Sequence, residues 1–203
     1  MTGVQTCALP ISMNSNLDDS GISLPVFPSR TNLKLHNISV TLKMVRKVVI
    51  NLDLSKASGP DCIPVVVLKN CEPGLSYILA ELFNKCLKES CFPDCWKVSS
   101  VVPVFKNVGE RSTTKNYHLV SLLSVVSKVF EKLVNSRIVD HLEKCGLFSD
   151  FQSDFRSSRS TAHLLTVASD RIARAFNRSG ATQAVALDIS KAFNRVWHAG
   201  LLH

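Results

Sequence analysis

The sequence predicts a mixed fold of the α/β (α+β) class, and three segments carry that expectation. Residues 75–89 place apolar side chains at the i, i+3, i+4, i+7 spacing of an amphipathic helix. Residues 96–105 are rich in valine and phenylalanine, as strands are. Near the end of the sequence, the apolar run 184–187 leads to Asp188 and then changes to helical spacing. We therefore expect a buried strand that delivers an acid at its carboxyl end and continues into a helix.

The segments before residue 116 predict a helix, a loop and an edge strand. Ser39 is expected to cap a helix that runs to about residue 52. Residues 53–64 are rich in Ser, Gly and Pro, which predicts a turn-rich loop. Pro103 interrupts the strand 96–105 and therefore suits an edge or a bulge, and turn residues predict a loop over 107–115.

Two more helices are expected in the second half of the sequence. One is amphipathic, runs from about residue 121 to residue 145, and ends at Gly146. Ser160 or Thr161 is expected to cap the other, which continues to about residue 177. Its inward face is expected to comprise Leu164, Leu165, Ala168, Ile172 and Phe176.

The composition predicts a globular protein with a polyanionic partner. The chain has 203 residues, of which 45% are hydrophobic and 20% charged, so extensive disorder is not expected. The net charge of +8 suits nucleic acid or an anionic membrane surface, and charge alone does not choose between them. No apolar run approaches the roughly 20 residues of a membrane span, so we expect a soluble chain with no membrane partner. Without a secretory signal pattern, the expected location is nuclear or cytoplasmic rather than secreted.

The seven cysteines show no framework pattern. Cys91 and Cys95 are the one close pair, and no second pair or His-rich partner accompanies them. Because a structural zinc site needs four ligands, we expect reduced thiols and no zinc.

Residues 1–30 have mixed polarity and three prolines, and we expect a poorly ordered leader. The first 12 residues resemble translated sequencing adapter; the alternative is a genuine short leader. Residues 31–203 are expected to form the one folded region.

Charged residues outside the apolar pattern are the candidate site residues. A lone carboxylate such as Asp188 at the end of an apolar strand must meet a cation or a metal, or else cap the following helix. The basic side chains near turns suit phosphate contacts, although each is also typical of an ordinary solvated surface. These are Lys106, Arg111, Lys115, Arg156 and Arg159.

Residues 187–198, which read LDISKAFNRVWH, resemble the first catalytic motif of reverse transcriptases from non-LTR retrotransposons, especially jockey-like elements. The resemblance implies that Asp188 binds both catalytic Mg²⁺ ions and that the Ile189 carbonyl completes the metal site. It also implies that Phe193 lies beneath the sugar of the nucleotide and excludes a ribose 2′-hydroxyl. Asn194 departs from the usual Asp of this motif, which bears on helix capping and local charge more than on metal binding.

Three earlier segments resemble motifs of the same reverse transcriptases, in the same order: residues 53–64, 116–124 and 151–161. The last implies that Arg156 binds the triphosphate of the incoming nucleotide, where a planar guanidinium pairs well with phosphate oxygens. Lys106 is expected to contact template or triphosphate from the tip of a fingers hairpin. Arg111, Lys115 and Arg159 are expected to contact nucleic acid.

Four residues in these segments differ from the family pattern: Cys62, His118, Leu119 and Asp154. Cys62 and Asp154 replace glycines, and glycine is used where the backbone has positive φ or must approach a ligand. His118 replaces an arginine, which removes a permanent charge from a position expected near the template.

The resemblance implies an incomplete right-hand polymerase fold, with helix-rich fingers and the start of the palm in residues 31–203. The implied activity is that of an RNA-directed DNA polymerase acting on an RNA template, a DNA primer and deoxynucleoside triphosphates with Mg²⁺; no protein partner is indicated. A two-metal site needs several carboxylates and this region supplies Asp188, so we expect truncation before the second carboxylate motif and no activity of this chain alone. The alternatives are a non-catalytic basic fragment that binds nucleic acid and a relic without function, and salt-dependent binding would favour the former.

Overall fold

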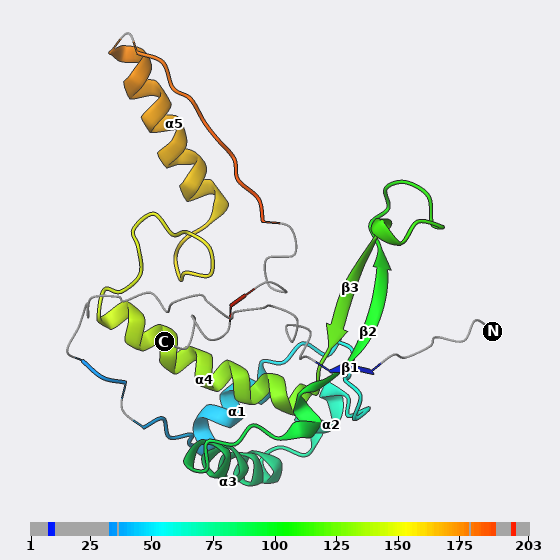
Figure 1. Cartoon of the computed structure of the whole chain (residues 1–203). Helices are drawn as coiled ribbons and strands as arrows, with labels where there is room; N and C mark the ends of the chain where they lie inside the picture. The colour runs from blue at the N-terminus through cyan, green and yellow to red at the C-terminus, as the bar shows by residue number, and fades with distance from the viewer. Residues whose placement is uncertain (1–7, 11–32, 36, 179, 190–195, 198–203) are drawn as a thin grey trace, which may run out of the picture. The chain divides into compact units, whose positions relative to one another are not determined.

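The computed structural model describes residues 8–10, 33–35, 37–178, 180–189 and 196–197 (Figure 1). Its described residues up to His141 form one compact unit, and those from Leu142 onward form a second. Helices and a small antiparallel sheet are both present, in agreement with the expected mixed class. Among the described residues, no helix has both the length and the apolar character that crossing a membrane requires.

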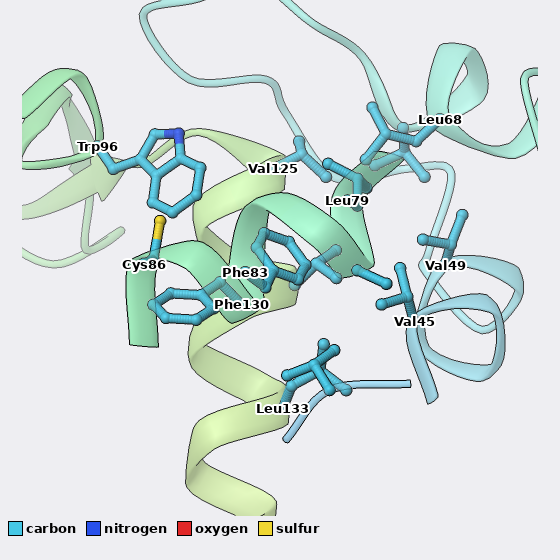
Figure 2. Close-up of a cluster of buried hydrophobic side chains, with 14 residues drawn as sticks. Val45, Val49, Leu68, Leu79, Phe83, Cys86, Trp96, Val125, Phe130 and Leu133 are labelled. Atoms are coloured by element: carbon cyan, nitrogen blue, oxygen red, sulfur yellow. The ribbon is translucent and has the colours of Figure 1, made fainter. Parts of the chain in front are cut away.

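Four helices build the core of the first unit: α1 (Leu42–Ile50), α2 (Val65–Asn70), α3 (Gly74–Lys88) and most of α4 (Val125–Lys144). The expected helix 75–89 is confirmed as α3, whereas the short helix α2 was not predicted. Apolar residues recurring every three or four positions on α3 and α4 face the same interior (Figure 2).

Aromatic side chains fill the centre of this core. Phe83 is fully buried, and its ring centroid lies 5.1 Å from that of Phe130 and 6.0 Å from that of Trp96. Phe92 packs on both Trp96 and Phe130. Trp96 belongs to the short 3₁₀ helix η1 (Asp94–Trp96), which carries the chain from α3 into the sheet. The buried apolar residues that the structure describes thus all belong to the first unit.

The start of α1 differs from the expected cap. The Asn84 side chain donates to the Val40 carbonyl and accepts from the Val40 N–H, both at 2.8 Å, which ties Val40 to α3. Thr41 is therefore the N-cap, and its hydroxyl accepts from the Met44 N–H. The prediction of Ser39 as the cap was wrong because this long-range amide contact delays the helix.

The sheet has the order β1-β2-β3 and is antiparallel, with β1 (Ala8–Pro10), β2 (Val98–Phe105) and β3 (Tyr117–Leu122). Strand β2 confirms the strand expected over 96–105. Strand β1 lies within the leader that was expected to be poorly ordered; it pairs with Val98–Ser100, where the edge of β2 would otherwise lack a partner. The rest of the leader, and the adapter-like residues other than 8–10, lie outside the described residues.

Pro103 fits this sheet because of the pairing pattern. The Lys106 N–H donates to the Asn116 carbonyl at 2.8 Å, and hydrogen-bonded pairs alternate along an antiparallel ladder. Pro103 pairs with Leu119 and therefore occupies a non-hydrogen-bonded position toward β3, where its missing N–H costs nothing. Strand β1 pairs only as far as Ser100, so Pro103 lies on an edge, as expected.

The long helix α4 begins later than expected. Residues 121 and 122 belong to β3, where they pair with Val101 and Ser100, so the helix starts at Val125 instead of Ser121. The prediction at that end was wrong because cross-strand pairing captures these residues. At the other end, Gly146 has φ +61°, the left-handed conformation that ends a helix, as predicted.

The loop 53–64 is confirmed as turn-rich, and Gly59 in it has a packing role. A Cβ atom on Gly59 would lie 2.4 Å from the Leu123 carbonyl carbon and from the Ser124 nitrogen, just before α4. Glycine is thus required for close approach of two backbones. Cys62 has φ +55°, a conformation that favours glycine and that explains the family's glycine at this position.

Helix α5 (Thr161–Asn177) has the expected bounds, and Ser160 caps it by accepting from the His163 N–H. The expected burial of its apolar face was wrong, since α5 has no buried residue. Leu165 is 64% exposed and Phe176 is 79% exposed. An amphipathic pattern predicts a side that favours burial, and the described residues place no packing surface over it.

Candidate functional site

The β2–β3 hairpin brings three of the predicted basic residues into one loop, which projects beyond the helices of the first unit (Figure 1). The Lys106 ammonium donates to the Lys115 carbonyl at 2.7 Å, so the two ends of the loop are tied together. The Arg111 guanidinium carbon lies 5.4 Å from the centre of the Phe105 ring. With Glu110 as the single acid, the loop presents a net positive charge.

Side chains of the hairpin hold this loop in shape. The Asn116 amide donates to the Glu110 carbonyl at 2.8 Å, and the Tyr117 hydroxyl donates to the Arg111 carbonyl at 2.9 Å. The 3₁₀ helix η2 (Thr114–Asn116) closes the loop, and Gly109 adopts φ +74° within it. The basic residues are therefore carried on an ordered loop, which lowers the entropy that a phosphate contact would have to overcome.

His118 and Leu119, two departures from the family pattern, lie on β3. They pair with Val104 and Pro103, respectively, and both side chains are exposed. His118 thus lies on the exposed surface of the hairpin, where the family has an arginine.

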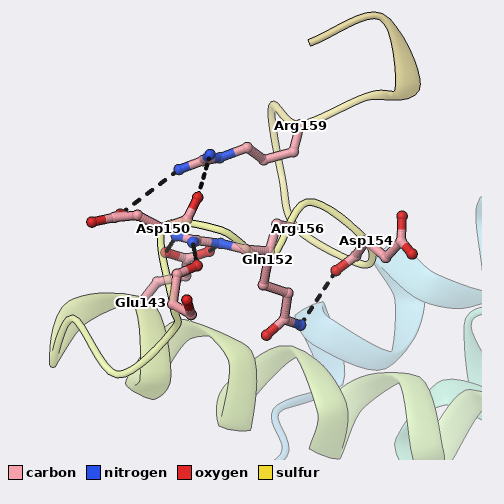
Figure 3. A network of polar contacts seen from close by, with 7 residues as sticks. Glu143, Asp150, Gln152, Asp154, Arg156 and Arg159 are labelled. Atoms are coloured by element: carbon pink, nitrogen blue, oxygen red, sulfur yellow. Dashed lines mark hydrogen bonds and ion pairs between the residues drawn. The ribbon is translucent and has the colours of Figure 1, made fainter. Parts of the chain in front are cut away.

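In the second unit, Arg156 is engaged by other protein groups (Figure 3). Its Nη2 lies 2.8 Å from Glu143 Oε2 and its Nε 3.1 Å from Glu143 Oε1, a bidentate pair. Its Nη1 donates to the Ser149 carbonyl at 3.0 Å, and the guanidinium covers the Phe148 ring. Its side chain is 12% exposed. The hydrogen bonds that its guanidinium donates to the Glu143 carboxylate raise the pKa of Arg156 above its ordinary value.

Arg159 is less engaged than Arg156. Its Nη1 donates to the Asp150 carbonyl at 3.2 Å, and its Nη2 lies 4.0 Å from the Asp150 carboxylate, whose side chain is 96% exposed. Such an exposed, distant pair contributes little.

Asp154 stands where the family has glycine, but its backbone does not adopt a conformation that needs glycine in this structure. The left-handed conformations in its segment are at Phe155 (φ +59°) and Ser158 (φ +60°) instead. The Asp154 carbonyl accepts from the Gln152 amide at 3.4 Å (Figure 3). The backbone conformation at this position is therefore compatible with Asp154.

Asp188 is exposed and lies in a segment without regular secondary structure. The expectation of a buried strand over 184–187 was wrong: Val185 is 76% exposed and Leu187 is 91% exposed. A strand needs a neighbour for its backbone groups and a surface for its apolar face, and the described residues provide neither. Within the described part of the chain, the Asp188 side chain has no hydrogen bond or ion pair; Ile189 is likewise exposed, and Phe193 and Asn194 lie outside the described residues.

The residues present do not make up a two-metal site. Over the described ranges, no group of three or more His, Cys, Asp or Glu side chains could hold a metal ion. Asp188 and the neighbouring Ile189 carbonyl offer at most a single carboxylate and one carbonyl, whereas a pair of Mg²⁺ ions needs several oxygen ligands from the protein and substrate. These residues alone therefore support no chemical step through a metal. Cys62, Cys71, Cys86, Cys91 and Cys95 are free thiols.

Two features of this unit were not predicted from the sequence. One is Glu143 as the partner of Arg156, and the other is a group of side chains along the first turns of α5. The partner of Arg156 lies 13 positions away, a spacing without periodic meaning. In contrast, His163, Val167 and Arg171 recur every four residues, and this helical spacing would have placed them on one face.

Comparison with known proteins identifies the class. Residues 106–203 match the family described as reverse transcriptase (RNA-dependent DNA polymerase). These matched residues belong to the reverse transcriptase family, and the mixed helix and sheet composition is compatible with a polymerase fold.

The relatives narrow this to non-LTR retrotransposons, as the motifs predicted. Three similar proteins come from Drosophila melanogaster. The probable RNA-directed DNA polymerase from transposon BS is 29% identical over 89% of this chain and 19% of its own length. That from transposon X-element is 31% identical over 77% of this chain and 17% of its own length. The RNA-directed DNA polymerase from mobile element jockey is 29% identical over 81% of this chain and 18% of its own length. The chain thus spans less than a fifth of the length of these relatives.

Proposed function

We propose that residues 31–203 serve as the fingers and the first palm segment of an RNA-directed DNA polymerase of a jockey-like element. The observation that carries this proposal is the family match over residues 106–203, which includes the motif around Asp188. The implied substrates are an RNA template, a DNA primer and deoxynucleoside triphosphates. The family implies a divalent metal, and Mg²⁺ is the ion we propose.

Within that enzyme, we assign Asp188 and the Ile189 carbonyl to the metal ions and Phe193 to the sugar of the incoming nucleotide. Arg156 and Lys106 would bind its phosphates. The 203-residue chain itself is expected to give no primer extension, because Asp188 is the one carboxylate that the proposal assigns to the metal ions. Templated product from purified chain that disappears in Asp188→Ala would contradict this expectation.

The activity proposed for the chain itself is non-catalytic binding of nucleic acid through the hairpin loop. Its support is the ordered loop that carries Lys106, Arg111 and Lys115. Binding of a fluorescent RNA–DNA primer–template is measured by anisotropy over a range of salt concentrations. Each phosphate contact adds roughly 0.7–0.9 to the slope of log affinity against log salt, so replacing all three residues with Gln should reduce the slope by about 2 to 3.

A matched variant separates this loop from general electrostatics. Lys43, Lys47 and Lys85 are exposed lysines on helices of the same unit, and replacing them with Gln removes the same net charge. We expect the slope of this control to stay close to that of the unaltered chain. Equal losses in both triple variants, or no binding at low salt, would overturn the assignment of the hairpin loop.

A further inference from the structure

The second unit contains a pocket of about 300 Å³ beside the first three turns of α5. Neither Arg156 nor Glu143 lines it. Side chains of two kinds line the pocket, basic and apolar, and those that matter here are Phe151, Arg159, His163, Leu164, Val167 and Arg171. Such a combination suits a ligand with a flat apolar part and a negative charge.

One wall of the pocket is an exposed aromatic ring with a guanidinium over it. The Arg171 guanidinium carbon lies 5.5 Å from the centre of the Phe151 ring, and the ring is 79% exposed. Leu164 and Val167 lie on α5 near Arg171 and supply apolar surface. A planar group can therefore stack on Phe151 next to a cation, the arrangement that single-stranded nucleic acids use on aromatic platforms.

The charges around the pocket favour a phosphate. Arg159 and Arg171 bring two guanidinium groups to the pocket, and His163 adds ring nitrogens. The Arg159 guanidinium has five N–H donors and, among the described residues, makes one hydrogen bond, to the Asp150 carbonyl. The Asp150 carboxylate also lines the pocket, but it is almost fully exposed and 4.0 Å from Arg159, so it offsets little of this charge.

We propose that this pocket binds one nucleotide of a single-stranded nucleic acid. The base stacks on Phe151 beside Leu164 and Val167, and the neighbouring phosphate pairs with Arg159 and Arg171. A single strand is required because bases within a duplex are already stacked and cannot reach a ring in a pocket. The inference deepens the proposed nucleic-acid function and rests on it.

The test measures binding of a short fluorescein-labelled oligouridine to the 203-residue chain by anisotropy. Phe151→Ala is expected to lower the affinity by about fivefold or more, the loss typical of one stacked base, whereas Phe151→Tyr retains it. Phe155→Ala is the matched control: Phe155 is 88% exposed in the same unit and does not line the pocket. Thermal unfolding of each variant verifies that folding is unchanged.

A second pair of variants tests the basic side. Arg171→Gln removes a guanidinium from the pocket, and Arg174→Gln removes one that lies outside it, paired with Asp170 at 2.9 Å. A larger loss for Arg171→Gln supports the pocket. Equal losses for both arginine variants, together with equal losses for Phe151→Ala and Phe155→Ala, overturn it.

Two further arms separate the alternatives. Displacement of the oligouridine by deoxythymidine triphosphate as readily as by unlabelled oligouridine would show a site for free nucleotides and would overturn the single-strand proposal. A chain that binds oligouridine with no dependence on Phe151 leaves the proposed function of the hairpin loop standing and refutes the pocket. A chain that binds no nucleic acid at all refutes both.

Discussion

Arg156 and Glu143 form a bidentate ion pair, with Nη2 2.8 Å from Oε2 and Nε 3.1 Å from Oε1. The pair joins the end of α4 to the loop that precedes α5, and the Ser149 carbonyl accepts from the remaining side of the guanidinium. The arginine that family resemblance assigns to triphosphate thus holds its own segment together in this structure.

Loss of this pair should loosen the loop between Gly146 and Ser160. We expect Arg156→Ala and Glu143→Ala each to accelerate amide hydrogen exchange in that loop. The double variant should be no worse than Arg156→Ala alone, because that substitution already removes the ion pair. Arg174→Ala breaks an exposed i,i+4 pair and should leave the loop unchanged. Additive effects in the double variant would show that the pair is not coupled.

The same pair should compete with a nucleotide. A triphosphate can pair with Arg156 only where Glu143 releases it, and the Glu143 carboxylate repels phosphate. Glu143→Gln is therefore expected to raise the affinity for deoxythymidine triphosphate, measured by titration calorimetry, whereas Arg156→Gln should lower it. A decrease of affinity in Glu143→Gln would argue that Glu143 positions Arg156 for the ligand.

Gly59 should not tolerate a side chain. The added methyl of Gly59→Ala would meet the backbone of Leu123 and Ser124 at 2.4 Å, and backbone yields less than a flexible side chain. We expect the free energy of unfolding to fall by about 3 kcal/mol, measured by urea denaturation. Gly74→Ala is the control, since a Cβ at Gly74 meets nothing within 4 Å and alanine favours the helix. Comparable losses at both glycines would refute the packing role of Gly59.

Replacing Cys62 with glycine, the residue that the family uses, should stabilise the protein. At φ +55° an L-residue is strained by about 1–2 kcal/mol, and glycine escapes this strain but loses more chain entropy on folding. We expect Cys62→Gly to raise the free energy of unfolding by about 0.5–1 kcal/mol. Cys71→Gly, at φ −85°, should lower it instead. Destabilisation of both variants alike would indicate that Cys62 is not strained.

The turn at Asp53 should depend on pH. The N–H of Ser55 donates to the Asp53 carboxylate at 2.9 Å and the Ser55 hydroxyl at 2.7 Å, and these bonds hold the pKa of Asp53 below its ordinary value of 3.8. Because the folded pKa is the lower one, this stabilisation is present above the unfolded pKa and is lost as the pH falls through the folded pKa. In an NMR titration, Ser55→Ala should move the Asp53 midpoint upward. An unmoved midpoint would leave the backbone N–H of Ser55 and the Lys56 ammonium as the causes of the lowered pKa.

Much of the fold follows from local patterns. The bounds of α3 and α5 follow from apolar spacing, the end of α4 from Gly146, and the cap of α5 from Ser160, because each depends on residues within about one helical turn. The family also follows from the sequence, since its motifs are strings of consecutive residues.

The expectations that failed all involve distant partners. Residues 121 and 122 were predicted to be helical but pair with β2. The apolar run 184–187 was predicted to be a buried strand, but Val185 and Leu187 are exposed. The predicted helix face of α5 is likewise uncovered. In each case a local pattern indicated a preference for pairing or burial, and whether it was satisfied depended on a surface supplied by another part of the chain.

The sequence by itself determined which residue types are available: one acid after an apolar run, a basic hairpin loop, and arginines around the start of α5. Only the tertiary structure decided that Arg156 faces Glu143, that Gly59 touches the backbone before α4, and that Phe151 and Arg171 line one pocket. The physical reason is the separation along the sequence over which each interaction acts. Helical spacing and caps act over a few residues, whereas ion pairs, backbone contacts and pockets join residues that only folding brings together.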